Sequence, residues 1–331
     1  MVVKVSKPEI NVREKISELD KPSGIAGEAM LRAETPLEQF NLIGAGRRNL
    51  IINGSMAISQ RSTSVSSQTA TGYKTVDRIR VNGSGGTYNQ SQQTVTVGGE
   101  TGLPVQFTKF LRHECTAGND NHLLMTRIED VSKFVGTMKL SFYAKGSGAD
   151  VLAVKFNQGF GSGGSTEIYT SAQSFTVTST WQRFEFDIVM PSITGKTVGV
   201  GNFGSVLFGQ DSSTSTAAWT LDITGLQWEH GNIATPFEHR SYGEELAACQ
   251  RYYYQNTNPS FYACQYVSSH KFVQWPHPVY MRASPSATVT YSSGSFTAYQ
   301  IDNKHFKAYI SSSYTDTSGY HVTSYKLDAE L

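Results

Sequence analysis

The chain of 331 residues is long enough for about two domains, and its content of charged residues is low. Charged residues make up 17% of the sequence, compared with roughly 25% in typical soluble domains, and many glycine, serine and threonine residues take their place. The 28 basic and 27 acidic residues nearly cancel, so the overall charge gives no reason to expect nucleic acid or an anionic membrane as a partner. This composition favours short β-strands joined by polar turns over charged amphipathic helices.

The cysteines and the apolar stretches exclude further classes. Cys115, Cys249 and Cys264 are too few and too widely spaced for a disulfide framework or a zinc knuckle. No stretch approaches the roughly 20 apolar residues of a membrane span, and residues 1–20 lack the apolar core of a signal peptide. The sequence therefore predicts a soluble chain without cofactor or metal site, which is assembled in a reducing cytoplasm.

Residues 1–47 differ in composition from the rest and contain two short helical patterns. The first pattern ends before Pro22. The second begins at Thr35, which can cap a helix, with Pro36 in the first helical position and Glu38 where it completes a capping box. So short a segment cannot bury a core of its own, so it is either a tail or, as we favour, a peptide that docks on a neighbouring subunit. The apolar residues expected to anchor it are Val12, Ile16, Leu19, Phe40 and Leu42.

Residues 48–240 show a period of two, which is typical of strands with one face in a core and one in water. Turn-rich segments separate these strands, and no long helical pattern lies between them. Such a succession predicts a mainly β fold, a jelly-roll β-sandwich. The apolar residues that follow this period are Leu140, Phe142 and Ala144; Leu152, Val154 and Phe156; Phe184, Phe186, Ile188 and Met190; and Trp219, Leu221 and Ile223.

Residues 241–331 begin with a second capping box and continue as a tyrosine-rich segment. Ser241 is the expected cap and Glu244 its reciprocal partner, at the start of a helix over 242–253. The residues expected on one face of this helix, as candidates for packing near an oligomer axis, are Leu246, Cys249 and Tyr253. Strand patterns follow at 287–291, 295–301 and 304–311, and they predict a small C-terminal β-domain.

The sequence contains no recognised catalytic or metal-binding motif. His113, Glu114 and Cys115 are adjacent in a predicted strand, so their side chains alternate between its faces and cannot converge on one metal. Sugar hydrolysis by paired carboxylates stays open, because their separation is not encoded in the sequence. The available carboxylates are Glu100, Glu114, Asp120, Glu129, Asp130, Glu167 and Asp187.

Sugar binding without hydrolysis requires only an aromatic face and a few placed polar groups. No single residue is identified as a sugar contact from the sequence. The aromatic candidates are Tyr73, Tyr88, Tyr143, Phe160 and Tyr169.

The polar stretch 225–255 contains Glu229, His230, Glu238, His239 and Arg240. No pair among them has the spacing of a catalytic or metal motif. The stretch is therefore interpreted as the junction at which the sandwich ends and the capped helix begins.

Several segments resemble the galactose-binding-like, carbohydrate-binding-type jelly-roll modules of bacteriophage fibre proteins. The most specific is WTLDITGLQWEHGNIATPFEHRSYGEELAACQRYYY, which is similar to their characteristic end. The N-terminal segment resembles the virion-attachment segment of fibre-like proteins from phages of marine bacteria, including cyanophages. The other similar segments are RRNLIINGSMAISQRSTS (47–64), YKTVDRIRV (73–81), MKLSFYAKGSG (138–148), FVQWPHPVYMRASPSATVTY (272–291) and the final KLDAEL.

This resemblance implies a short trimeric fibre of the virion, with an attachment segment at 1–47, a jelly-roll module at 48–240 and a C-terminal module at 241–331. The partners that it implies are two further copies of the chain, other virion proteins of tail or capsid, and host surface glycans. A capsid decoration or head-fibre protein is the alternative, since the chain lacks an extended shaft. A glycan depolymerase is a weaker alternative, and we expect no enzyme activity.

Overall fold

The computed structural model describes residues 47–83, 86–96, 98–117, 121–148, 150–211, 218–257, 259, 264–267, 270–293, 296–311 and 321–331. The chain falls into two compact units, Met1–Arg48 and Asn49–Leu331. The second unit contains all the elements that follow.

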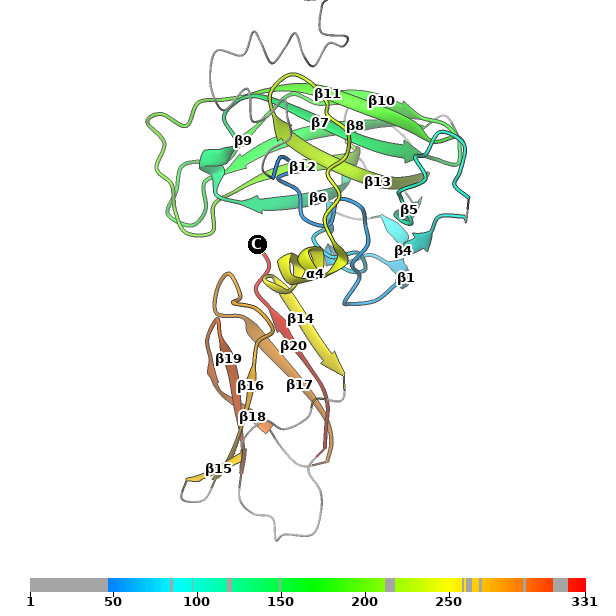
Figure 1. The fold of residues 1–331 in the computed structure, drawn as a ribbon. Coiled ribbons are helices and arrows are strands. Elements are labelled where there is room, and N and C mark those ends of the chain that lie inside the picture. Colours follow the sequence, from blue (N-terminus) through cyan, green and yellow to red (C-terminus); the bar gives the residue numbers. More distant parts are fainter. Residues whose placement is uncertain are drawn as a thin grey trace, which may run out of the picture. The chain divides into compact units, whose positions relative to one another are not determined.

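Two antiparallel sheets form the larger part of this unit (Figure 1). The first sheet consists, in spatial order, of β1 (Ser64–Gln68), β4 (Thr87–Thr94), β5 (Lys109–Ala117), β13 (Trp219–His230), β7 (Gly136–Lys145) and β11 (Gln182–Met190). The second sheet consists of β10 (Gln173–Val177), β8 (Asp150–Gly159), β12 (Phe203–Gln210), β6 (His122–Glu129), β3 (Arg80–Gly83) and β2 (Gly72–Tyr73), with β9 (Ile168–Tyr169) beside β8. A 3-10 turn, η1 (Val131–Lys133), follows β6.

The two sheets enclose one apolar core, to which alternate residues of both contribute. Trp228 of β13 is fully buried, and its ring stacks on Phe134 with a centroid distance of 4.5 Å. Phe156, from the opposite sheet, lies 5.4 Å from the same indole. This architecture confirms the predicted mainly β fold with a β-sandwich.

Helix α4 (Tyr242–Gln250) begins as the sequence predicts. The Ser241 hydroxyl accepts from the backbone N–H of Glu244, and the Glu244 side chain accepts from the backbone of Ser241. The predicted end of the helix at 253 is wrong, because Tyr253 is the first residue of strand β14 (Tyr253–Thr257). The polypeptide leaves the helix at Arg251, and Tyr253 then pairs in register with Asp328.

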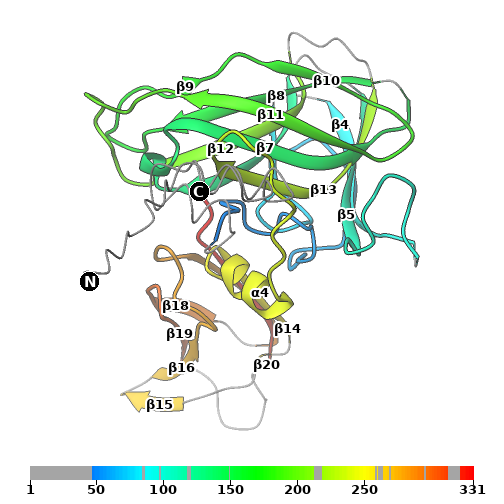
Figure 2. The same ribbon diagram turned by 45° about the horizontal axis from the view of Figure 1, so that its top comes forward.

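The residues after α4 form two small antiparallel sheets (Figure 2). The third sheet consists of β14, β20 (His321–Asp328) and β17 (Ser286–Ser293), and the fourth of β15 (Cys264–Val267), β16 (His270–Pro276), β19 (His305–Ser311) and β18 (Phe296–Ile301). They share a second core around Trp275, whose ring lies 5.4 Å from Phe306 and 5.3 Å from Tyr325. Three predicted strands, at 287–291, 295–301 and 304–311, are confirmed here as β17, β18 and β19.

The burial of Asp222 departs from the alternating pattern predicted for β13. Asp222 lies between Leu221 and Ile223 on β13, where a solvent-facing residue is expected, yet it is only 2% exposed. The reason is the neighbouring Arg112 of β5, which donates from Nε and Nη2 to the two carboxylate oxygens at 2.8 and 2.7 Å. The guanidinium covers the carboxylate and compensates its desolvation.

The anchoring residues Val12, Ile16, Leu19, Phe40 and Leu42 lie outside the described residues, and so does Asp120. The roles of these residues and the domain boundaries at 47 and 240 remain predictions. Among the described residues, no helix combines the length and the apolar character that a membrane crossing requires.

Candidate functional site

The outer face of the second sheet carries the side chains that alternate with the core residues of β8, β12 and β6. Register places Tyr169 of β9 opposite Asn157 of β8, Asn157 opposite Ser205 of β12, and Ser205 opposite Arg127 of β6. Because opposite residues of antiparallel strands share a face, these four side chains form one line across the strands. Together with Glu167, which precedes β9, they are called the polar row.

Hydrogen bonds hold the exposed end of the polar row in place. Glu167 Oε2 accepts from the Tyr169 hydroxyl at 2.8 Å and from Asn157 Nδ2 at 3.2 Å. The Ser205 hydroxyl donates to Asn157 Oδ1 at 3.1 Å. Asn157 and Ser205 are 1% and 0% exposed, whereas Tyr169 is 53% exposed. The row therefore presents an accessible aromatic ring whose exposed partner, Glu167, is held in turn by the buried amide of Asn157.

Burial and charge set the protonation of the two ends of the row. Burial, together with the hydrogen bond to Glu167, raises the pKa of Tyr169 to about 12, so its hydroxyl remains protonated at neutral pH. Burial lowers the pKa of Arg127, and the like charge of Arg80 lowers it further. The Arg127 guanidinium lies 4.3 Å from the centroid of the Phe203 ring and donates to the backbone oxygen of Leu331 at 2.8 Å.

Apolar residues lie beside the polar row on the same face. Leu123, Met125 and Leu207 form a cluster separate from the main core, and all three are buried. The buried cluster supports the sheet beneath the row, and an exposed phenol ring with polar groups beside it is the combination that accommodates a sugar ring.

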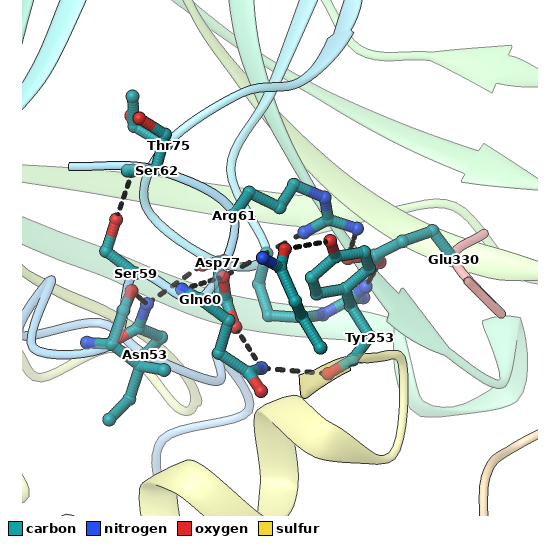
Figure 3. A network of polar contacts seen from close by, with 12 residues as sticks. Asn53, Ser59, Gln60, Arg61, Ser62, Thr75, Asp77, Tyr253 and Glu330 are labelled. Atoms are coloured by element: carbon teal, nitrogen blue, oxygen red, sulfur yellow. Dashed lines mark hydrogen bonds and ion pairs between the residues drawn. The ribbon is translucent and has the colours of Figure 1, made fainter. Parts of the chain in front are cut away.

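A second cluster of polar side chains lies where the end of β20 meets the loops of the sandwich (Figure 3). Arg61 donates to Asp328 at 3.3 Å and to Glu330 at 3.2 Å, and its guanidinium lies 3.6 Å from the centroid of the Tyr253 ring. Gln60 donates from Nε2 to Asp77 Oδ2 at 2.5 Å and to the backbone oxygen of Tyr253 at 2.8 Å. The charged groups of this arginine–tyrosine junction pair with one another, as in a structural contact.

Arg78 and Asp77 are the two charges of the junction that are almost fully buried. The side chain of Arg78 is 1% exposed, it pairs with Glu330, and its guanidinium lies 3.5 Å from the centroid of the Tyr252 ring. Its φ of 70° is in the left-handed region that is uncommon for a side-chain-bearing residue. Burial also raises the pKa of the neighbouring Asp77, and Gln60 and Arg61 partly oppose that shift. The tertiary contacts therefore hold Arg78 in an unfavourable backbone conformation, and Glu330 compensates its buried charge.

The polar stretch at 225–255 contributes hydrogen bonds and an ion pair within the chain. Glu229 accepts from the backbone N–H of Thr235 at 2.9 Å and from its hydroxyl at 2.7 Å. Arg240 pairs with Glu245 at 3.3 Å and donates to the backbone oxygen of Ile51 at 3.0 Å. These bonds join the start of the sandwich to β13 and α4.

The sequence-predicted oligomer residues are placed within the chain. Cys249 is 1% and Tyr253 is 4% exposed, while Leu246 is half-buried. Burial raises the pKa of the Cys249 thiol well above its usual value. Two of the three therefore pack inside this chain, and a role for them at an oligomer axis remains a prediction.

The predicted aromatic candidates differ in their exposure to solvent, and each described carboxylate candidate has a polar partner. Tyr88 and Phe160 are core residues, Tyr73 and Tyr143 are half-buried, and Tyr169 is exposed. Each carboxylate candidate on a described residue contacts a nearby polar partner, as follows: Glu100 with Lys145, Glu114 with Asn89, Glu129 with Arg251, Asp130 with Ser132, Glu167 with Tyr169, and Asp187 with Lys139. Within the described ranges, no three His, Cys, Asp or Glu side chains gather closely enough to hold a metal ion.

Sequence reasoning missed Asn157, Ser205 and Arg127. Each alternates with core residues on its own strand, and this was a usable signal for an outward-facing position. Their alignment across three strands depends on register, which the separate patterns do not encode.

Sequence reasoning also missed a buried histidine pair inside the sandwich. The Nε2 atoms of His113 and His122 lie 2.9 Å apart, and the two rings stack with a centroid distance of 5.0 Å. Tyr88 and Trp219 lie against them, with ring centroids 5.1 and 5.2 Å from His113. Burial lowers the pKa of His113 well below its usual value, and the neighbouring His122 lowers it further.

The chain matches no known protein-family model. It matches no curated protein sequence either. Among solved structures, it is similar to the enzymatically active domain of tailspike protein 4 from bacteriophage CBA120, with a TM-score of 0.32 and 12% identity over 55% of this chain and 21% of the tailspike chain. The chain thus spans about a fifth of that tailspike domain's length.

Two carbohydrate-binding modules are similar at the same level. The N-terminal cellulose-binding domain of β-1,4-glucanase C from Cellulomonas fimi matches with a TM-score of 0.31 and 15% identity over 44% of this chain and 90% of that one. The family 11 carbohydrate-binding module of Lic26A-Cel5E from Clostridium thermocellum matches with a TM-score of 0.32 and 15% identity over 51% and 96%. Each is a likeness in fold at low sequence identity.

The histidine pair makes stability depend on pH. The folded-state pKa of His113 is below its unfolded value near 6.5, so the stability present above pH 6.5 is lost as the pH falls toward the folded-state pKa. For this one group we expect the free energy of unfolding to fall by up to about 1.4 kcal/mol per pH unit below pH 6. Chemical denaturation at pH 7.5, 6.0 and 5.0 measures this dependence of the unfolding free energy on pH.

His113→Gln is expected to flatten this slope. The matched control is Tyr88→Phe in the same cluster, which should keep the slope because the pKa of Tyr88 is raised to about 12 by burial. Equal slopes for wild type and His113→Gln would show that His113 does not cause the pH dependence of stability.

The arginine–tyrosine junction is expected to stabilise the fold through Glu330. Glu330→Gln keeps the shape of the side chain but leaves the Arg78 charge buried without a carboxylate, which should cost about 2–4 kcal/mol of unfolding free energy. Glu185→Gln is the control. Its ion pair with Arg183 is 39% exposed at the carboxylate and should contribute less than about 1 kcal/mol. Denaturant titration followed by tryptophan fluorescence measures the unfolding free energy of both variants. An equal loss of unfolding free energy in both would refute the stabilising role of the junction.

Proposed function

We propose that this protein is a glycan-binding adhesion protein and that the polar row is its sugar-binding site. The observation that carries the proposal is the half-exposed ring of Tyr169, held by Glu167 beside the buried amide of Asn157. An aromatic face that is fixed in advance loses little conformational entropy when a sugar stacks on it. The exposed Glu167 carboxylate and the half-buried Arg127 guanidinium are the polar groups of the row that can orient the sugar hydroxyls.

We propose binding without cleavage. Glycoside hydrolysis uses two carboxylic groups on opposite sides of the scissile bond, one of which must be free to transfer a proton. The carboxylates near the polar row are held by neighbours: Glu129 by Arg251 at 2.9 Å, Asp211 by Lys155, and Glu167 by Tyr169 at 2.8 Å. A reducing-end assay on host surface polysaccharide tests this part, and released oligosaccharide would overturn it.

We further propose that the protein acts in a phage virion as a short trimeric fibre. The resemblance of residues 219–254 to the end of fibre jelly-roll modules supports this setting. The alternative of a capsid decoration protein rests on the same resemblance. Light scattering after gel filtration measures the oligomer, and a monomer at micromolar concentration would contradict a trimer. Gold labelling of intact particles distinguishes tail from capsid.

Tyr169→Ala is expected to reduce glycan affinity at least tenfold, because it removes the stacking face and the donor to Glu167. The measurement is binding of the purified chain to a glycan array, followed by calorimetry with the best oligosaccharide. Tyr242→Ala is the matched control, since Tyr242 is 65% exposed and lies on α4 rather than on the second sheet. Equal loss in both variants, or no loss in Tyr169→Ala, would place binding elsewhere.

A further inference from the structure

The third and fourth sheets, which form the C-terminal module, have an apolar core that is separate from that of the sandwich. Two such parts of one chain are expected to move and open independently unless their interface holds them together. The residues Asp328–Leu331, called the strap, leave the second core and contact side chains of the sandwich. The strap is therefore the candidate for coupling the two parts.

Both ends of the C-terminal module are attached at the same place. Its first strand, β14, pairs with its last strand, β20, so that Tyr253 lies opposite Asp328. Arg61 of the sandwich contacts both members of this pair. Its guanidinium lies 3.6 Å from the centroid of the Tyr253 ring, and its Nη2 lies 3.3 Å from Asp328 Oδ2. Because β14 is already in place, the contacts of the strap form at a high effective concentration.

Arg282 holds the backbone of the strap on the side of the C-terminal module. Its Nε donates to the backbone oxygen of Ala329 at 2.6 Å, and its Nη2 donates to that of Glu330 at 3.1 Å. The backbone N–H of Arg282 donates to the oxygen of Arg251 at 2.9 Å, and that of Ala329 donates to the oxygen of Tyr252 at 2.8 Å. Ala329 is also part of the second core, so the strap has a fixed position on the module.

Three arginines bind the strap on the side of the sandwich. Glu330 pairs with Arg78 and, at 3.2 Å, with Arg61. Arg127 of β6 donates from Nη1 to an oxygen of Leu331 at 2.8 Å. The side chains of Arg78 and Glu330 are 1% and 6% exposed, so salt screens this pair much less than a surface pair. The strap is thus held from both sides by directed hydrogen bonds and ion pairs.

We infer that the strap makes the sandwich and the C-terminal module one cooperative unit, in which the second core does not open without the first. The inference is independent of the proposed function. It also differs from the loss of total stability expected for Glu330→Gln, because it concerns which parts of the chain open together. Opening of the module alone would break the contacts of the strap with Arg61, Arg78 and Arg127, so this partly open form should have a low population.

Native-state hydrogen exchange of the full chain in rising denaturant tests the inference. Peptides from β12 report on the first core, and peptides from β19 report on the second. In the wild-type chain we expect the opening constants of the two sets of amides to agree within tenfold, as they do for parts of one cooperative unit. A larger difference, with β19 opening first, would overturn the inference.

Arg282→Gln and Arg61→Gln loosen the strap from its two sides. In each variant we expect the opening constant of β19 to rise at least tenfold relative to that of β12, because the module can then open alone. Arg112→Gln is the matched control. Arg112 pairs with Asp222 at 2.7 Å within the first sheet, so its loss should raise both opening constants by the same factor.

Circular dichroism establishes that each variant is folded. Separate opening in at least one folded strap variant, together with joint opening in the control, supports the inference. Joint opening of β12 and β19 in every folded strap variant would show that the strap does not couple the two cores. If neither strap variant folds, the wild-type comparison of β12 with β19 still decides whether the two cores open as one unit.

Discussion

The antiparallel register of β12 between β8 and β6 is the constraint on which the candidate site depends. All eight residues of β12 are buried, with Val206 and Phe208 in the sandwich core and Ser205 and Leu207 on the opposite face. Because side chains alternate strictly along a strand, a shift of one residue would exchange these two sets and place polar groups in the core. The core therefore fixes the register, and the register fixes the alignment of the polar row. The site is a consequence of packing that occurs on the other side of the sheet.

Charge is treated differently in two parts of the same unit. At the arginine–tyrosine junction, Arg61 and Arg78 are buried against carboxylates and tyrosine rings, so each charge has an opposite charge to compensate its desolvation. On the outer face of the second sheet, Arg80 donates to the side-chain oxygen of Asn82, and Arg127 donates to an oxygen of Leu331. Buried charges in a structural contact such as the junction are normally compensated by opposite charges.

The proposed role agrees with the distribution of rigidity around the polar row. Tyr169 is held through Glu167 and Asn157, and Asn157 is held in turn by Ser205 on a strand from the middle of the sheet. A surface that is ordered before it binds loses less entropy when a flexible polysaccharide docks on it. For a virion protein that displays several copies, weak single sites are sufficient, since linked copies raise the overall affinity without any new contact.

Local patterns in the sequence predict the mainly β class, most strand positions and the start of α4, and they include no recognised catalytic motif. These features follow from local periods and from capping chemistry, both of which act over a few residues. Contacts between distant parts of the chain bury Asp222 under Arg112, end the helix before Tyr253 and set which outward-facing residues meet. Cross-strand partners such as Ser205 and Arg127 are distant in the sequence, and their pairing results from packing of the whole sandwich. A strand pattern shows which way a side chain points, but its neighbours on that face depend on register and on burial by other strands.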